Sequence, residues 1–450
     1  MVRFFYLVII SLLFFCTSKA QTLSEKIDNY ISIELKKFNI PSVSVAVVNV
    51  DNLLFNKTYG KDVIIDRQYY IGSVSKSLTA LGVLKLIEKD KLDFDSKLVD
   101  IIPNLNIAPY NDITIRHLLN QTSGIKKADG FITLPELKDI ANKGYTINNV
   151  TVPGTSYQYS NLNYTLLGLV IEKVSGTSYQ AYMQDKIFFD LNMPKSTAEI
   201  PNNVDAHYQY LGVPIETQQL EYSRTTIPAG FIISTTKDLA NYVMMNLNNG
   251  RIYNRQVLGI PLLKQMHKVW NDGDFGYAMG WKQGKFNNQR MLQHLGTTAT
   301  SNSGIFIFPD DKIGLVVLTN SNSMWFTEEL MEGLLHIITN NEPKSTSNFE
   351  YYFRFAVVVI IAFLIAFFTF KTVRIVKSKQ VYNTKKETKK VIIHIVLIIL
   401  LFIGFPIITK IPFTAFLSFQ PDIGFLILAI SIVPIVLSLL KIYNTFNQQQ

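Results

Sequence analysis

Hydrophobic and polar residues follow two different periods in residues 21–342. Short runs rich in β-branched and aromatic residues, bounded by turn-forming residues, predict strands near both ends of this segment. The runs fall at residues 43–50, 53–59, 289–294, 304–308 and 314–319. The first two surround the turn Asp51-Asn52 and the last two surround a turn at 309–312, so each pair predicts an antiparallel hairpin.

Between these runs the apolar residues have helical spacing. Helical patterns cover residues 22–39, 115–119, 134–142, 164–174 and the segment after Ser73, where we expect a long amphipathic helix. Strands at both ends with helices between them predict an α+β fold. We expect one antiparallel sheet, completed by both ends of the domain, flanked by helices and carrying an inserted helical lobe.

The last hundred residues have a different pattern. Residues 351–370, 391–408 and 424–440 each approach the roughly 20 apolar residues that cross a bilayer. Residues 371–390 hold eight Lys or Arg and one Glu, which predicts a cytoplasmic loop that contacts anionic lipid. The prediction is then a linker at 343–350, an extracytoplasmic loop at 409–423 and a cytoplasmic tail at 441–450. The domain at 21–342 is expected outside the cell membrane, in a multi-pass protein.

The first twenty residues read as a secretory signal, which agrees with that orientation. Arg3 precedes an apolar stretch at 4–15, and Ser18-Lys19-Ala20 fits a cleavage site. Cys16 is the only cysteine, so cleavage would leave a chain without disulfides. Residues 351–450 carry eleven basic and two acidic side chains, so their charge equals the net charge of +9 of the whole chain.

Residues 21–350 have a small negative net charge, and nothing in them indicates nucleic-acid binding. The histidines show no metal-ligand spacing, so we expect no metal and no other cofactor. The sequence specifies no oligomeric state.

Ser73 and Lys76 lie one helical turn apart, at the start of the predicted amphipathic helix. A serine there sits in the positive field of a helix N-terminus, which favours an alkoxide and an oxyanion. Three other serines have a lysine three residues later. Ser123 lies in a predicted turn, Ser234 at a predicted helix cap and Ser438 in an apolar span. A second interpretation stays open, in which Ser73 only caps the helix and Lys76 is solvated.

Two further motifs follow in order, Tyr159-Ser160-Asn161 and His294-Leu295-Gly296. Tyrosine and histidine can relay protons and stabilise charge near a nucleophilic serine. Taken singly, a Tyr-x-Asn is more often a buried tyrosine with a paired hydroxyl, and a lone histidine is more often structural than catalytic.

The chain resembles the serine β-lactamase-like hydrolases, in the branch that contains class C β-lactamases, D-alanyl-D-alanine carboxypeptidases and related esterases. The resemblance covers nearly all of residues 30–325. It rests on motifs that occur in the family's order: Ile40–Ala46, Ile71–Lys76, His117–Gly124, Pro153–Thr155, Tyr159–Asn161, Leu167-Gly168, Ala229-Gly230, Ser234-Thr235, Gly276-Tyr277, His294–Gly296 and Leu318–Asn320.

The resemblance implies a role for each site residue. Ser73 would be the acylated nucleophile, with Lys76 as its base or proton shuttle. Tyr159 would be the general base or the relay to the leaving group, and Asn161 would orient Lys76 and the substrate. His294 and Gly296 would lie on the substrate strand. The backbone N–H groups of Ser73 and Thr297 would form the oxyanion hole.

Two residues depart from the family pattern. His294 stands where relatives often have the lysine of a Lys-Thr-Gly strand. Lys282 and Lys312 also have Lys-x-Gly spacing, but each is expected beside a turn or loop, so His294 is preferred. A histidine with an ordinary pKa near 6.5 attracts a substrate carboxylate less than lysine does. The second departure is Gln121, where many relatives have histidine.

The resulting hypothesis is a membrane-anchored, extracytoplasmic serine hydrolase. It would act on an ester, amide or β-lactam carbonyl of a small molecule or peptide through an acyl-enzyme. One alternative is a penicillin-binding D,D-peptidase that trims cell-wall peptides. Another is a catalytically idle ligand-binding or sensor module coupled to the three spans.

Overall fold

A seven-stranded antiparallel sheet forms the centre of the N-terminal domain. The computed structural model describes residues 21–448 apart from 62, 65, 127–133, 143–145, 201–203, 218–222, 272, 274, 379, 410 and 411. The strand order is β11-β12-β13-β14-β15-β1-β2. The strands are β11 (Gly276–Ala278), β12 (Trp281–Phe286), β13 (Gln289–Thr297), β14 (Asn302–Phe308), β15 (Ile313–Thr319), β1 (Ser42–Asn49) and β2 (Leu53–Gly60).

The first and last strands of the domain lie side by side. Strand β1 pairs with β15 from Val43↔Thr319 to Asn49↔Ile313. This pairing confirms that both ends of the domain complete one sheet. Strand β1 is buried on both faces, with Val45 and Val47 in one core cluster and Ala46 and Val48 in the other.

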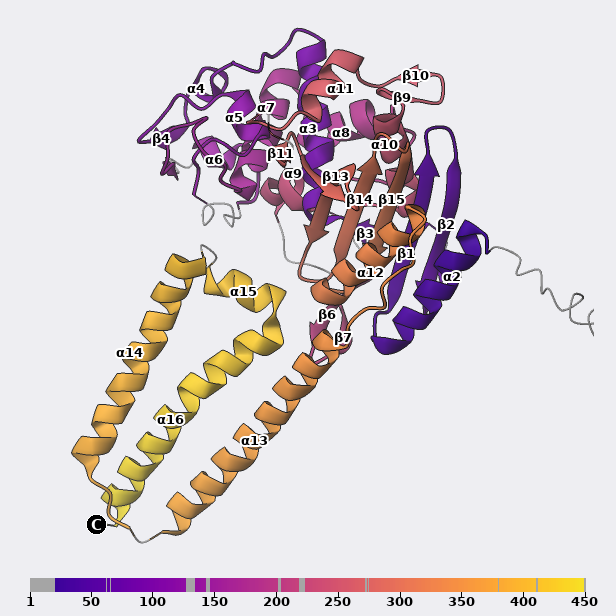
Figure 1. Cartoon of the computed structure of the whole chain (residues 1–450). Coiled ribbons are helices and arrows are strands. Elements are labelled where there is room, and N and C mark those ends of the chain that lie inside the picture. The colour runs from indigo at the N-terminus through magenta and orange to yellow at the C-terminus, as the bar shows by residue number, and fades with distance from the viewer. Residues whose placement is uncertain are drawn as a thin grey trace, which may run out of the picture.

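Helices cover both faces of the sheet (Figure 1). Helices α2 (Leu23–Glu34) and α12 (Met324–Ile338) pack together on one face and share a core cluster with β1 and β15. The other face packs against α10 (Thr236–Leu247) and α3 (Ser75–Glu88). Beyond α3 lies the predicted helical lobe, so the predicted fold class is confirmed.

The remaining elements of the domain are short, apart from α7. The helices are α4 (Leu98–Ile101), α5 (Ile115–Leu119), α6 (Asp139–Asn142), α7 (Asn161–Ser175), α8 (Tyr179–Met183), α9 (Ile227–Gly230) and α11 (Ile260–Met266). The strands pair as β3 (Tyr69–Tyr70) with β8 (Ile233–Ser234), β4 (Asn106–Ala108) with β5 (Thr146–Asn148), β6 (Ala206–Tyr210) with β7 (Val213–Thr217), and β9 (Arg251–Ile252) with β10 (Arg255–Gln256).

Two helix predictions were wrong in detail. The pattern at 134–142 becomes a helix only from Asp139, because residues 134–138 form turns, and Leu134 bonds to Thr225. Helix α3 is not amphipathic, since all its residues from Ser75 to Leu86 are buried. The hydroxyls of Ser75 and Ser77 bond to the carbonyls of the preceding turn, which satisfies them without water.

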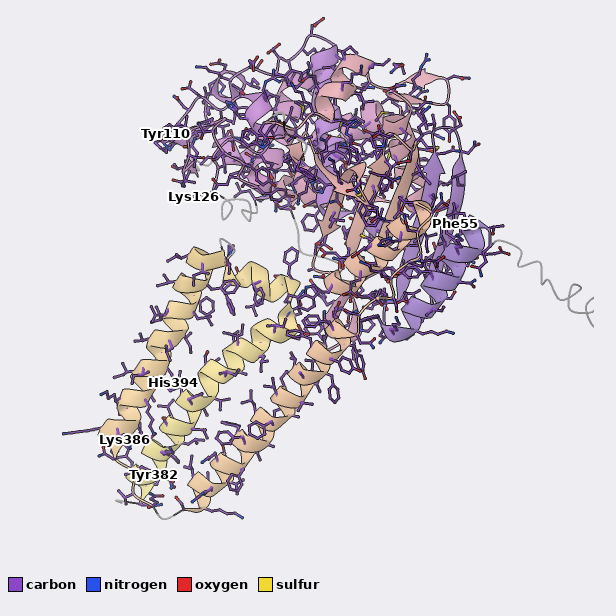
Figure 2. All side chains as sticks on the ribbon, in the orientation of Figure 1. Phe55, Tyr110, Lys126, Tyr382, Lys386 and His394 are labelled. Carbon is purple, nitrogen blue, oxygen red and sulfur yellow. The ribbon has the colours of Figure 1, made fainter. Side chains whose placement is uncertain are left out.

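Three long helices follow the domain and form a separate layer (Figure 1). Helices α13 (Phe349–Lys377), α14 (Thr384–Thr409) and α16 (Pro421–Asn447) are long and apolar enough to cross a membrane. Helix α16 packs between α13 and α14, and α15 (Phe413–Phe419) joins α14 to α16 on the side of the domain. Figure 2 shows Tyr382, Lys386 and His394 in the part of the helices that lies away from the domain.

The helices extend beyond the apolar spans that the sequence marks. The segment 371–390 was expected to be a loop, but 371–377 continue α13 and 384–390 begin α14. Its basic residues therefore lie largely on helix ends. Residues 409–423 likewise contain α15, and 441–447 belong to α16. The predicted signal at 1–20 lies outside the described residues.

A buried ion cluster fixes the domain to the helices. Glu350, in the first turn of α13, accepts hydrogen bonds from Ser323 Oγ at 2.7 Å and from Arg354 Nη2 at 2.9 Å. Arg354 also donates to Asp422 of α16 at 2.8 Å, and Asp422 accepts the backbone N–H of Leu211 at 3.2 Å. The predicted linker thus ends in a tightly bonded junction.

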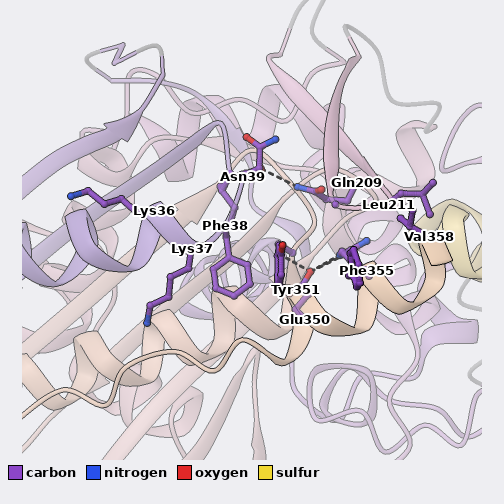
Figure 3. Close-up of a pocket in the computed structure, with 14 residues that line it drawn as sticks. Lys36, Lys37, Phe38, Asn39, Gln209, Leu211, Glu350, Tyr351, Phe355 and Val358 are labelled. Atoms are coloured by element: carbon purple, nitrogen blue, oxygen red, sulfur yellow. Dashed lines mark hydrogen bonds and ion pairs between the residues drawn. The ribbon is translucent and has the colours of Figure 1, made fainter.

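The same junction borders a cavity of about 410 Å³ between the domain and α13 (Figure 3). Gln209 of β6 lines this cavity and donates its side-chain N–H to the carbonyl of Asn39 at 3.5 Å. Asn322 donates to the carbonyl of Phe419 at the end of α15, at 3.0 Å. Domain and helices are therefore joined by hydrogen bonds at several points.

Candidate active site

Ser73 lies in a short 3₁₀ turn, Gly72–Val74, directly before α3. Gly72 has a φ of +51°, and a Cβ there would lie 2.4 Å from the backbone nitrogen of Thr297. Only a glycine lets the turn approach the end of β13 this closely. The approach places the backbone of Ser73 beside that of Thr297.

Lys76 is fully buried one turn after Ser73. Its Nζ lies 2.9 Å from Ser73 Oγ and 2.8 Å from Asn161 Oδ1, and it also bonds to the carbonyl of Ala229. Burial, and then the positive charge of Lys282, hold the pKa of Lys76 well below that of an ordinary lysine. A neutral amine has two N–H donors and one lone pair, which matches these three partners.

Tyr159 precedes α7 and donates its hydroxyl to Ser73 Oγ at 2.9 Å. Burial raises the pKa of this phenol far above its usual range, so the hydroxyl keeps its proton. The structure therefore brings Ser73, Lys76, Tyr159 and Asn161 into one hydrogen-bonded cluster.

Gln121 positions this tyrosine, although the sequence gave it no role. Its side-chain oxygen accepts the N–H of Ser160 at 2.9 Å, and its backbone carbonyl accepts the N–H of Gln158 at 2.8 Å. Gln121 is itself fully buried, with a φ of +59°. Gln121 therefore forms hydrogen bonds with both residues that flank Tyr159.

His294 lies on β13 beside the cluster and is held in the neutral form. Its Nδ1 lies 2.7 Å from the carbonyl of Leu295 and must carry the proton to donate there. Its Nε2 is left to accept from the hydroxyl of Tyr277, at 3.5 Å. Burial is the main cause that lowers the pKa of His294 to about 3, so the ordinary value expected from the sequence does not apply.

Gly296 and Thr297 form the end of the same strand. A Cβ on Gly296 would lie 2.2 Å from the carbonyl oxygen of Ile71, so this strand also needs a glycine. The N–H of Thr298 bonds to the carbonyl of Ser301 at 2.9 Å, so these two residues form a hydrogen-bonded pair. Because bonded and non-bonded pairs alternate in an antiparallel ladder, the next pair, Thr297 and Asn302, has no backbone hydrogen bonds between its two residues. The N–H of Thr297 consequently points away from β14.

A cavity of about 420 Å³ opens next to these residues. Ser73, Tyr159, His294 and Thr297 line it. It is also lined by four residues that the sequence did not assign to the site, namely Tyr157, Gln158, Lys282 and Leu295. Tyr157 and Gln158 lie beside a motif and Leu295 lies within one, whereas the only sequence signal at Lys282 is its Lys-x-Gly spacing.

The sequence suggested that Lys282 precedes a loop. In the structure it lies within strand β12. It pairs with Gln293 of β13 and with Tyr277 of β11. Strand β11 has three residues, too few for a periodic pattern. The hairpin that carries Lys282 to the cavity was therefore invisible in the sequence.

Residues 27–334 match the family model described as Beta-lactamase. The chain belongs to the beta-lactamase family. This match confirms the resemblance that the ordered motifs indicate. Members of the family are mostly serine hydrolases.

Two curated relatives illustrate the range of the family. The chain is 29% identical over 351 residues to Protein flp of Staphylococcus aureus (strain MRSA252), which covers 72% of this chain and 68% of that protein. It is 33% identical over 157 residues to Penicillin-binding protein 4* of Bacillus subtilis (strain 168), covering 32% of this chain and 34% of that protein.

Solved structures show the same beta-lactamase fold. The octameric penicillin-binding protein homologue from Pyrococcus abyssi superposes with a TM-score of 0.61 at 25% identity, covering 73% of this chain and 80% of that one. The D-alanine carboxypeptidase AmpC from Burkholderia cenocepacia gives a TM-score of 0.59 at 18% identity, covering 71% and 99%.

Proposed function

We propose that the protein is a serine hydrolase that forms an acyl-enzyme at Ser73 with ester, amide or β-lactam carbonyls. One observation carries the proposal. Ser73 Oγ lies 2.9 Å from both Lys76 Nζ and the Tyr159 hydroxyl, and burial shifts the pKa of each group toward the neutral form that the chemistry needs. A serine that only capped a helix would need neither partner.

Acylation follows from these protonation states. The lone pair of neutral Lys76 takes the Ser73 proton as Oγ attacks the carbonyl carbon. The N–H groups of Ser73 and Thr297 stabilise the negative oxygen of the tetrahedral intermediate. Tyr159 then gives its proton to the leaving group, which departs and leaves the acyl-enzyme, a lysine ammonium and a tyrosinate.

Deacylation reverses these transfers. The tyrosinate takes a proton from water as the water oxygen attacks the acyl carbon. Lys76 returns its proton to Ser73 Oγ when the ester bond breaks. Each group recovers its starting state, so we assign Lys76 as the acylation base and Tyr159 as the acid of the first step.

The proposal includes a membrane location with the domain outside the cytoplasm. The three apolar helices support the anchoring. Lys371, Arg374 and Lys377 at the end of α13, with the lysines at the start of α14, lie at the end of the helices far from the domain. The positive-inside rule then places that end in the cytoplasm.

Trapping the acyl-enzyme tests the proposal. Full-length protein in detergent is mixed with 4-nitrophenyl acetate, quenched in acid and digested. We expect hydrolysis above the rate of heat-unfolded protein and an acetyl group on the peptide that contains Ser73. Absence of hydrolysis with ester, amide and β-lactam substrates alike would contradict the proposal.

A further inference from the structure

A side chain holds the end of strand β13, where the proposed oxyanion donor lies. Thr297 is the last residue of β13, and Asn302, the first residue of β14, lies opposite it. The side-chain amide of Asn302 donates to the hydroxyl of Thr297 at 3.3 Å. Because this pair has no backbone hydrogen bonds between its two residues, the side-chain bond joins the two strands at this point.

The same amide also bonds to the segment that follows β15. Asn302 Oδ1 accepts the backbone N–H of Ser323 at 2.9 Å, and its Nδ2 lies 3.5 Å from Asn322 Oδ1. Asn302 is 3% exposed, and Asn322 and Ser323 are also buried. Hydrogen bonds are stronger in such a low-dielectric environment than in water. One buried amide thus links the end of β13 to residues 322 and 323.

Residues 322 and 323 are bonded in turn to two of the helices that follow the domain. Ser323 Oγ donates at 2.7 Å to Glu350 in the first turn of α13, which is labelled in Figure 3. Asn322 Nδ2 donates at 3.0 Å to the carbonyl of Phe419, the last residue of α15. The two bonds use different side chains, so α13 and α15 are connected to Asn302 separately.

An oxyanion donor tolerates little displacement. It has to lie about 2.7–3.1 Å from the oxygen that becomes negative, and removal of one donor lowers kcat about 10²- to 10³-fold. The N–H of Thr297 moves with the backbone of its strand, so its position depends on the contacts that fix the end of β13. The bond to Asn302 makes that position depend on α13 and α15.

We propose that Asn302 is a positioning residue for the oxyanion hole, which fixes Thr297 by fastening the end of β13 to α13 and α15. This assignment rests on the proposed function and gives the helices after the domain a role beyond anchoring. They hold one part of the active site in its working geometry. Cutting their bonds to residues 322 and 323 should therefore weaken catalysis, although neither residue lines the cavity beside Ser73.

Two esters that differ in one atom test the assignment on the full-length protein in detergent. 4-Nitrophenyl acetate places oxygen in the oxyanion hole, whereas O-(4-nitrophenyl) thioacetate places sulfur there, and sulfur is a weak hydrogen-bond acceptor. Release of 4-nitrophenolate gives kcat/KM for each ester. The ratio of the two values, divided by the same ratio for hydroxide, measures the oxyanion hole. A variant that merely unfolds loses both activities equally and keeps this ratio.

In Asn302→Ala we expect the ratio to fall about tenfold, a part of the effect of losing a whole donor. Asn322→Ala combined with Ser323→Ala keeps the amide of Asn302 but removes both side chains that reach the helices. This double variant should lower the ratio about two- to tenfold, the range for one hydrogen bond. The control is Asn241→Ala, which removes a buried asparagine of α10 that bonds to the carbonyl of Asn192, and should keep the native ratio.

An unchanged ratio in Asn302→Ala, or a native ratio equal to that of hydroxide, would overturn the assignment while the proposed function stands. A ratio that falls in Asn302→Ala but not in the double variant would overturn the fastening to the helices. Native protein that hydrolyses neither these esters nor any amide or β-lactam would overturn the proposed function and the assignment with it.

Discussion

Lys76→Met is expected to lower kcat/KM for ester hydrolysis about 10²- to 10⁴-fold, the usual contribution of a positioned general base. Methionine has a similar length but no basic nitrogen, so the Ser73 proton loses its acceptor. Asn161 Oδ1 and the Ala229 carbonyl lose their donor at the same time. Steady-state kinetics of the purified full-length variant measures the effect.

The pH profile distinguishes loss of a base from loss of structure. In the native protein kcat/KM should fall as the pH drops through the lowered pKa of Lys76, because the protonated amine cannot accept a proton. This acid limb should disappear in Lys76→Met. Lys91→Met, which alters an exposed lysine just beyond α3, serves as the control. Near-native kcat/KM in Lys76→Met would rule out Lys76 as the base.

Arg354→Met is expected to lower the free energy of unfolding by about 3–5 kcal/mol, the cost of breaking a buried ion pair from one side. Glu350 and Asp422 would both remain buried without their shared cation, because each is less than 5% exposed. Chemical or thermal unfolding of the full chain in detergent measures the change.

The control for this variant is Arg374→Met, which removes an exposed arginine from the same helix and should have little effect. Adding Glu350→Gln and Asp422→Asn to Arg354→Met removes the stranded charges and should recover part of the loss. If Arg354→Met unfolds at the native midpoint, the cluster does not fasten the domain to α13 and α16.

The cluster also reaches the candidate site. Ser323, which donates to Glu350, donates its backbone N–H to Asn302 at 2.9 Å. Asn302 in turn donates to the hydroxyl of Thr297 at 3.3 Å. Hydrogen bonds thus continue from the first turn of α13 to the end of the strand that carries the proposed oxyanion donor.

Local patterns explain which parts of the site could be predicted. Ser73 and Lys76 are one helical turn apart, and Tyr159 and Asn161 are two residues apart in sequence, where α7 begins. The hairpin β1–β2 was also predictable, since Asp51 and Asn52 mark its turn and both strands are eight residues long.

Long-range packing explains what the sequence concealed. Lys282 reaches the cavity because the short strand β11 turns back into β12, and three residues carry no periodic signal. Gln121 supports Tyr159 across 39 residues of sequence, through a bond to Ser160. Helix α3 was expected to be amphipathic, but the hydroxyls of Ser75 and Ser77 bond to nearby carbonyls inside the core.

The most direct test of the account is the intact mass of the full chain after exposure to a fluorophosphonate. We predict a single adduct on the native protein, the same adduct on Ser77→Ala and none on Ser73→Ala. Ser77 is the matched control because it is a buried serine of the same helix whose hydroxyl bonds to Val74 O. A folded native protein without an adduct would contradict an activated Ser73 and favour a ligand-binding or sensor role. An adduct that persists in Ser73→Ala would place the nucleophile elsewhere.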